Sequence, residues 1–147
     1  MSKEPVDILL VEDNPNDLEL TLHAFKKNGL AQRIQVARDG VEALDFLFRR
    51  GAFANAEEAQ YPKMILLDLK LPKIDGIEVL RQIKSDPKMR RLPVVVLTSS
   101  RQDRDIDECY NLGVNSYIVK PVDFEKFMAA ASILGTYWLS FNQPSMM

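Results

Sequence analysis

Short runs of apolar residues recur along the chain and predict the strands of a sheet. Four runs are continuous and one is weaker, and they cover residues 8–11, 64–67, 94–97 and 117–119, with the weaker run at 34–37. Continuous apolar runs without polar alternation are typical of strands that are covered on both faces. The pattern therefore predicts four short, buried strands and a fifth strand at the weaker run.

The segments between these runs carry apolar residues at helical spacing. In the first segment Leu18, Leu22 and Phe25 lie at positions i, i+4 and i+7, and Asn14 with Pro15 provides a helix start. The same spacing predicts further helices at Val41, Leu44 and Phe48, at Ile77, Leu80 and Ile83, at Ile106 and Tyr110, and in a last helix from about Asp123 to Ser140. Strand and helix thus alternate five times. This order predicts a doubly wound α/β domain, with helices on both faces of a parallel sheet.

Composition limits the classes of protein that remain. With 147 residues and 46% hydrophobic content, the chain is expected to form one domain over 1–147, with a core at about 6–140, a loose tail at 142–147 and no output domain. A net charge of −2 argues against a nucleic-acid partner. The lone Cys109 and the lone His23 exclude an internal disulfide and a Cys- or His-rich metal site. No signal peptide or membrane-length apolar stretch is visible, so we expect a cytoplasmic protein without a membrane partner.

Polar residues that directly follow the predicted strands carry the candidate chemistry. These residues are Glu12, Asp13, Asp68, Thr98 and Lys120. Because the carboxyl ends of parallel strands meet at one edge of a sheet, these side chains are expected to converge. Three clustered carboxylates repel one another, and Lys120 supplies only one counter-charge. The all-oxygen donor set therefore predicts a hard divalent cation, Mg²⁺, rather than zinc.

A carboxylate beside Mg²⁺, a lysine and a hydroxyl suits phosphoryl transfer. An aspartate in such a place can act as the nucleophile and form an aspartyl phosphate. The metal and Lys120 would neutralise the phosphoryl oxygens, and Thr98 would form a hydrogen bond to one of them. Acidic residues after strands also commonly cap helices, so the prediction depends on the agreement of four strand ends.

Four segments of the sequence resemble the receiver (CheY-like) domain of two-component response regulators. They are Ile-Leu-Leu-Val-Glu-Asp-Asn at 8–14, Leu-Leu-Asp-Leu-Lys-Leu-Pro-Lys-Ile-Asp-Gly at 66–76, Val-Val-Leu-Thr-Ser at 95–99 and Tyr-Ile-Val-Lys-Pro at 117–121. The resemblance implies a flavodoxin-like (βα)5 fold with the strand order 2-1-3-4-5. It also implies phosphorylation by a partner histidine kinase in a phosphorelay.

The resemblance further implies a role for individual residues. Asp68 would be the phosphoacceptor, and Thr98 and Lys120 would contact the phosphoryl group. Tyr117 matches the aromatic switch position of the family. The implied Mg²⁺ ligands are Glu12, Asp13, Asp68 and the backbone carbonyl of Lys70.

Three further features are similar to single-domain regulators that are paired with phytochrome histidine kinases. They are an insertion within 51–62, the loop at 71–76 and the aromatic end of the last helix at 137–139. The resemblance implies that phosphorylation changes the surface of the fourth helix, fifth strand and fifth helix. This surface would then contact a downstream protein, which the sequence does not identify.

Three other functions compete with this interpretation. An aspartate-nucleophile phosphatase needs a general acid two residues beyond the nucleophile, where Lys70 stands, so no enzymatic activity is expected beyond Mg²⁺-dependent self-phosphorylation and autodephosphorylation. A docking module that is never phosphorylated would not need the set of Asp13, Asp68 and Lys120. A flavin-binding module needs a phosphate-binding loop after the first strand, where Glu12 and Asp13 would repel the phosphate. Turnover of small phosphomonoesters would distinguish the phosphatase from a receiver.

The last helix also predicts self-association. Phe124, Tyr137, Leu139 and Phe141 have no obvious partner in the core, and Tyr117 lies on the neighbouring strand. An exposed apolar patch usually marks an interface, and a twofold homodimer is the commonest way to bury one. In the alternative arrangement, Tyr137 and Leu139 fold back over the second or fourth helix.

Overall fold

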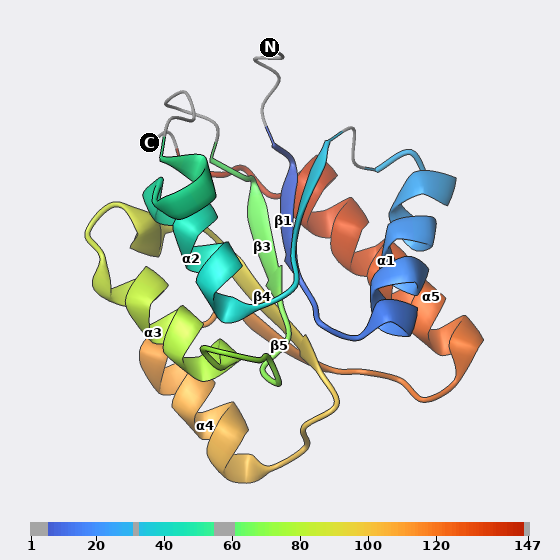
Figure 1. Cartoon of the computed structure of the whole chain (residues 1–147). Coiled ribbons are helices and arrows are strands. Elements are labelled where there is room, and N and C mark those ends of the chain that lie inside the picture. Colours follow the sequence, from blue (N-terminus) through green and yellow to red (C-terminus); the bar gives the residue numbers. More distant parts are fainter. Residues whose placement is uncertain (1–5, 31–32, 55–60, 146–147) are drawn as a thin grey trace.

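The computed structural model describes residues 6–30, 33–54 and 61–145 and contains one parallel sheet (Figure 1). Its strands are β1 (Ile8–Val11), β2 (Ile34–Ala37), β3 (Met64–Leu67), β4 (Val94–Thr98) and β5 (Ser116–Val119). They lie in the order β2-β1-β3-β4-β5, and each neighbouring pair is parallel. The predicted strands and the strand order that the resemblance implied are both confirmed.

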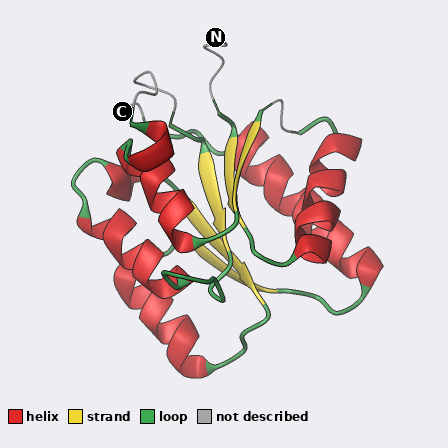
Figure 2. Cartoon of the chain, in the orientation of Figure 1, coloured by secondary structure: helices red, strands yellow, loops and turns green. Residues whose placement is uncertain are grey.

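A helix follows each strand, so that strand and helix alternate along the chain (Figure 2). The helices are α1 (Pro15–Lys27), α2 (Gly40–Phe48), α3 (Gly76–Ser85), α4 (Asp103–Leu112) and α5 (Phe124–Thr136). Helices α1 and α5 cover one face of the sheet, and α2, α3 and α4 cover the other (Figure 1). Successive residues of a strand point to opposite faces. Leu9 and Val11 accordingly pack in the core under α2, α3 and α4, whereas Ile8 and Leu10 pack under α1 and α5.

Burial differs between the centre and the edges of the sheet. All residues of β1, β3 and β4 are buried, as their apolar runs predict. The edge strands differ, because all four residues of β5 and three of the four residues of β2 are only half-buried. An edge strand has a neighbour on one side only, so covering helices leave part of it open.

Side-chain caps fix the loops at the carboxyl edge of the sheet. Asn14 caps α1 by accepting hydrogen bonds from the backbone N–H groups of Asn16 and Asp17, at 2.9 and 3.1 Å. Asp75 caps α3 in the same way by accepting from the N–H of Glu78 at 2.9 Å. Each such cap contributes about 1 kcal/mol to stability. The loops after β1 and β3 are therefore held firmly beside the residues that end those strands.

The end of the chain departs from the prediction. Asp123 is the N-cap of α5, and the α-helix ends at Thr136, where a π-helical turn over Tyr137–Phe141 replaces the predicted continuation. Leu139 packs partly against the core under α1 and α5, so the expectation that it has no core partner is wrong. Residues 55–60 of the predicted insertion and 146–147 of the predicted tail lie outside the described residues.

Within the described part of the chain, no helix is long and apolar enough to cross a bilayer.

The backbone of Gly76 packs directly against the backbone of Leu69 and of Asp68, the predicted phosphoacceptor. Its N–H donates to the carbonyl of Leu69 at 2.8 Å. A Cβ at this position would lie 2.3 Å from the carbonyl oxygen of Asp68 and 2.5 Å from the Cα of Leu69. Both atoms belong to the backbone, so a side chain here would displace the segment that positions Asp68.

We predict that Gly76→Ala destabilises the fold by about 1–3 kcal/mol, the usual cost of forcing an extra methyl group into a packed site. The measurement is urea unfolding followed by circular dichroism. Ser85→Ala is the control, because Ser85 is exposed at the other end of α3 and should change stability by no more than about 0.5 kcal/mol. Equal stabilities of the two variants would contradict this account of the β3–α3 junction.

Candidate functional site

Lys120 lies at the centre of a cluster of carboxylates at the carboxyl edge of the sheet. Its Nζ atom is 2.8 Å from Oε1 of Glu12, 3.0 Å from Oδ2 of Asp68 and 2.8 Å from Oδ2 of Asp17. A lysine ammonium has three N–H donors, and these three oxygens are enough to accept all of them. Its side chain is only 9% exposed, so the ammonium is held inside the protein rather than in solvent.

The charges of this cluster do not balance. Glu12 and Asp68 are both buried, and burial, helped by the nearby charge of Asp68, raises the pKa of Glu12 to about 7 despite its ion pair with Lys120. Burial opposes the charge on Lys120 as well, but hydrogen bonds to Asp17 and Glu12 outweigh it and raise the pKa of the ammonium above its ordinary value. One ammonium therefore serves three carboxylates, which leaves an excess of negative charge when all three are ionised.

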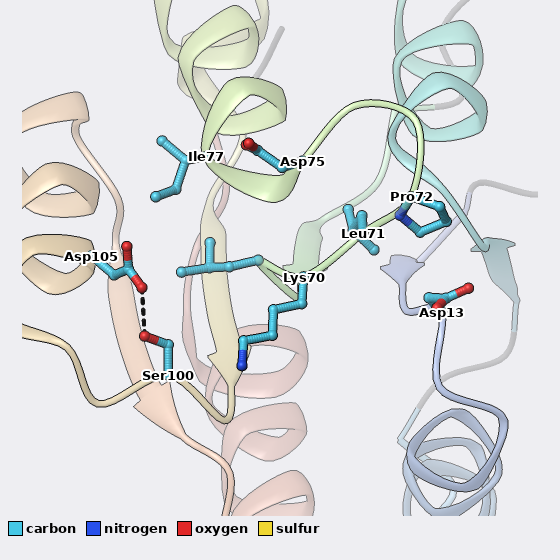
Figure 3. A pocket seen from close by; sticks show the side chains of 9 residues that line it. Asp13, Lys70, Leu71, Pro72, Asp75, Ile77, Ser100 and Asp105 are labelled. Atoms are coloured by element: carbon cyan, nitrogen blue, oxygen red, sulfur yellow. Dashed lines mark hydrogen bonds between the residues drawn. The ribbon is translucent and has the colours of Figure 1, made fainter.

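Asp13 and Lys70 lie next to this cluster and line an open pocket of about 460 Å³ (Figure 3). The pocket is bounded by the loop after β1, the loop between β3 and α3, and the start of α4. Both residues are exposed. The backbone N–H of Lys70 donates a long hydrogen bond, at 3.4 Å, to Oδ1 of Asp68. The carboxylate of Asp68 thus contacts the backbone N–H of Lys70, which lines the pocket, and the ammonium of Lys120, which lies inside the protein.

These oxygen donors fit a hard divalent cation. Among the described residues, no three Asp, Glu, His or Cys side chains form a ready-made metal-binding group. Two of the implied ligands, Glu12 and Asp68, are paired with Lys120, and the third, Asp13, is exposed. Mg²⁺ is usually held by one or two carboxylates and several waters rather than by a complete protein cage. Glu12, Asp13, Asp68 and the carbonyl of Lys70 could hold such an ion.

The loop after β4 connects Thr98 with Tyr117. Thr98 ends β4 and is fully buried, and its Oγ1 accepts a long hydrogen bond, at 3.4 Å, from the N–H of Ser100. The hydroxyl of Tyr117 donates to the carbonyl of Ser100 at 3.0 Å. The hydroxyl of Ser100 donates to Oδ2 of Asp105 at 2.5 Å (Figure 3). Ser100 therefore links the predicted phosphoryl ligand Thr98, the predicted switch residue Tyr117 and the first turn of α4.

The residues predicted for a dimer interface are not gathered in one patch. Tyr117 packs against the core under α2, α3 and α4, on the face of the sheet away from α5. Phe124 and Tyr137 are exposed at opposite ends of α5, about 20 Å apart along the helix axis. Tyr137 instead lines an apolar groove with Ile133 and Phe141, which are also exposed.

Sequence reasoning missed Asp17 and Asp105. It placed Ser100 at a position that tunes dephosphorylation in receiver domains, but it did not predict the contacts of Ser100 with Tyr117 and Asp105. An acidic residue in the first turn of a helix is ordinary, because it interacts favourably with the helix dipole. The position of Asp17 therefore gave no separate signal of its contact with Lys120, which lies 103 residues further along the chain. Ser100 and Asp105 meet only because the loop after β4 turns back on the start of α4.

A buried aspartate beside a lysine and further carboxylates, at the carboxyl edge of a five-stranded parallel sheet, is typical of α/β signalling domains that accept a phosphoryl group. The family model of the response regulator receiver domain matches residues 8–132, and the chain belongs to this family. Receiver domains are signalling proteins that receive their phosphoryl group from a histidine kinase. The predicted resemblance is confirmed.

Two individual proteins are similar to this chain over most of its length. The chain is 43% identical over 142 residues to the probable methanogenesis regulatory protein FilR2 of Methanothrix harundinacea. The aligned region covers 97% of this chain and 89% of FilR2. It is 38% identical over 138 residues to response regulator Rcp1 of Synechocystis. This aligned region covers 94% of this chain and 92% of Rcp1. The similarity therefore extends over nearly the full length of both relatives.

Two solved structures share the fold closely. The Mn²⁺-bound form of Rcp1 has a TM-score of 0.89 and 37% identity, over 97% of this chain and 100% of that chain. The phosphorylated cyanobacterial phytochrome response regulator RcpA has a TM-score of 0.89 and 40% identity, with the same coverage. The similarity to phytochrome response regulators that the sequence suggested is thus confirmed.

We predict that Glu12 makes the protein less stable as the pH rises from about 4.5 to 7 when divalent cations are removed with EDTA. The pKa of Glu12 is higher in the folded protein than the ordinary 4.5, so the folded state binds more protons than the unfolded state in this range. The free energy of unfolding must then fall with rising pH. Glu12→Gln cannot titrate and should gain about 1–3 kcal/mol relative to the unaltered protein across this window.

Urea unfolding at several pH values tests this expectation. Glu19→Gln is a matched control, because Glu19 is exposed on α1. The assignment is wrong if the unaltered protein and Glu12→Gln differ by the same amount at pH 4.5 and at pH 7.5.

Proposed function

We propose that this chain is a response regulator that accepts a phosphoryl group on Asp68 from a partner histidine kinase, in the presence of Mg²⁺. The observation that carries the proposal is the environment of Asp68. Its carboxylate is buried, its Oδ2 lies 3.0 Å from the ammonium of Lys120, and it ends the central strand β3 beside an open pocket. The pocket is lined by Leu69 and Lys70, which directly follow Asp68, and the charge of the carboxylate is compensated by Lys120.

In the proposed reaction, an oxygen of Asp68 forms a bond to phosphorus as the P–N bond of the kinase phosphohistidine breaks. Mg²⁺, when bound by Glu12, Asp13, Asp68 and the carbonyl of Lys70, would supply positive charge for the phosphoryl oxygens. Lys120 supplies a further positive charge, and its N–H already points to the reacting carboxylate. Both charges act where negative charge accumulates in phosphoryl transfer.

The response to phosphorylation would begin at Thr98. The phosphoryl group adds about 1.5 to 2 negative charges and three hydrogen-bond acceptors. If the Thr98 hydroxyl turns to one of them, it gives up its present bond to the N–H of Ser100. Because the Tyr117 hydroxyl bonds to the carbonyl of that same Ser100, the loop shift would reach Tyr117 and the surface of α4, β5 and α5. Phosphorylation then only has to favour one of two packings.

The partners follow from the same proposal. The similarity to RcpA favours a kinase of the phytochrome type, and the switched surface of α4, β5 and α5 would bind a downstream protein. A small-molecule phosphatase is not favoured, because the side chain two residues beyond Asp68 is that of Lys70, which is not a carboxylic acid.

We predict that Asp68 is the single labelled residue when the protein is incubated with a cognate kinase or with acetyl phosphate and Mg²⁺. Asp68→Asn should abolish the label, because an amide cannot attack phosphorus in this way. Asp13→Ala should lower the labelling rate by about tenfold or more, because it removes a proposed Mg²⁺ ligand and even the loss of a residue that only supports a ligand commonly costs that much. Asp107→Asn is the control, since Asp107 is exposed on α4. A base-labile label that persists in Asp68→Asn would place the nucleophile elsewhere.

We also propose that the protein forms a homodimer through the carboxyl end of α5. Of the interface residues predicted from the sequence, Tyr137 and Phe141 are the best placed, because both are exposed and line the groove with Ile133. Tyr117, Phe124 and Leu139 lie outside this groove.

For this dimer we predict that Tyr137→Ala with Phe141→Ala weakens association by about tenfold or more, since each aromatic side chain buries a large apolar area. Sedimentation at micromolar concentration, with and without phosphorylation, measures the effect. Val122→Ala is the control, because Val122 is 97% exposed but lies before α5. A monomer in both states would rule the dimer out.

A further inference from the structure

Lys120 and the divalent cation of the proposed function compete for the same two carboxylates. The ammonium lies 2.8 Å from Glu12 and 3.0 Å from Asp68, and both side chains belong to the proposed cation ligands. A cation that takes over these oxygens must weaken their ion pairs with Lys120. An ammonium as buried as this one cannot be left without partners except at a high cost in free energy.

Asp17 is a partner of Lys120 that lies outside the proposed cation ligands. Its Oδ2 accepts a hydrogen bond from the ammonium at 2.8 Å, and its side chain is 26% exposed. The backbone of Asp17 is fixed on both sides. Its N–H donates to the Asn14 side chain, and its carbonyl accepts from the hydroxyl of the buried Thr21 at 2.8 Å. The carboxylate is thus presented to Lys120 by a rigid first turn of α1.

We propose that Asp17 is a positioning residue that keeps Lys120 in the site while Glu12 and Asp68 pass to the cation. The proposal rests on the proposed function, because it requires a divalent cation at these carboxylates. Asp17 gives the ammonium one charged partner that the cation does not need. Lysine and cation can then occupy the site together, as the transfer of a phosphoryl group to Asp68 requires.

Loss of Asp17 has a defined consequence in this arrangement. Without it, Lys120 has only Glu12 and Asp68 as charged partners in the cluster, and it holds them more strongly. Cation binding must then break an ion pair that has no replacement. Asp17 therefore supports Mg²⁺ affinity without being a ligand, and it does so through Lys120.

Calorimetric titration of the unphosphorylated protein with MgCl₂ tests the proposal. We expect Asp17→Asn to raise the Kd for Mg²⁺ about three- to tenfold, within the range of coupling seen between members of one salt-bridge network. Glu19→Gln removes the same charge from an exposed position on the same helix and should leave the Kd nearly unchanged. An unchanged Kd in Asp17→Asn, or an equal rise in Glu19→Gln, would overturn the proposal.

A double-mutant cycle with Lys120→Met separates positioning from simple attraction between charges. If Asp17 acts through the lysine, Asp17→Asn has no effect on the Kd once Lys120 is replaced. If Asp17 attracts the cation directly, the Kd rises equally in both backgrounds, and the proposal fails. Should Lys120→Met not fold, the single variant in 0.5 M KCl decides the question, because that concentration screens long-range attraction but affects a buried contact much less.

The same titrations distinguish this inference from the proposed function. An unaltered protein that binds no Mg²⁺ contradicts the cation assignment itself, and the role of Asp17 with it. An unaltered protein that binds Mg²⁺ normally, together with an unchanged Asp17→Asn, contradicts the role of Asp17 alone.

Discussion

The ion cluster around Lys120 is the interaction on which the carboxyl edge of the sheet depends. Two carboxylates, those of Glu12 and Asp68, are buried there at the ends of neighbouring strands. Buried charges are tolerated only when they are paired and hydrogen-bonded. Lys120 follows β5 at the far edge of the sheet and reaches the ends of β1 and β3 as well as α1. The contact that makes the buried aspartate tolerable thus also connects it with the edge strand.

The cluster is satisfied in hydrogen bonds but not in charge, and this difference gives the site its chemistry. A fully neutral cluster would have little affinity for a cation and no reason to change when a phosphoryl group arrives. Here burial raises the pKa of Glu12, so the surroundings of this carboxyl group oppose its ionisation. A divalent cation bound beside Glu12 would favour its ionised form. Added positive charge would therefore stabilise the cluster around the proposed acceptor Asp68.

The sequence predicted the strands, the burial of the three central ones and the polar residues at their carboxyl ends, because each of these depends on local runs of residues. Apolar runs of three or four residues specify strands, and a parallel arrangement brings Glu12, Asp68, Thr98 and Lys120 to one edge whatever the strand order. The order of the strands came from the resemblance to receiver domains and not from periodicity. The pattern of apolar residues therefore predicted the layers of the fold, whereas the strand order could be predicted only from the resemblance to a known family.

The contacts that the sequence did not predict all involve residues with an ordinary local explanation. Asp17 is typical of a helix start, and its second role depends on a lysine that the topology places opposite it. Leu139 was expected on the surface because an ideal α-helix was extended to Ser140, whereas the π-helical turn after Thr136 changes the direction of the side chains that follow. The spacing of apolar residues along the chain cannot predict either effect, since the first depends on a distant segment and the second on a non-ideal helical turn.

The position of β5 in the sheet explains how a rigid site could communicate with a changeable surface. The proposed acceptor Asp68 directly follows β3, which is fully buried and has a strand on each side, so the backbone there cannot move without disturbing the core. β5 has only β4 as a neighbour and is half-buried along its length. Tyr117 can therefore change its contacts with the loop of Ser100 without repacking the central strands. The fold thus places the carboxylates of the proposed site beside fully buried strands, and it places Tyr117, the predicted switch residue, on a half-buried edge strand.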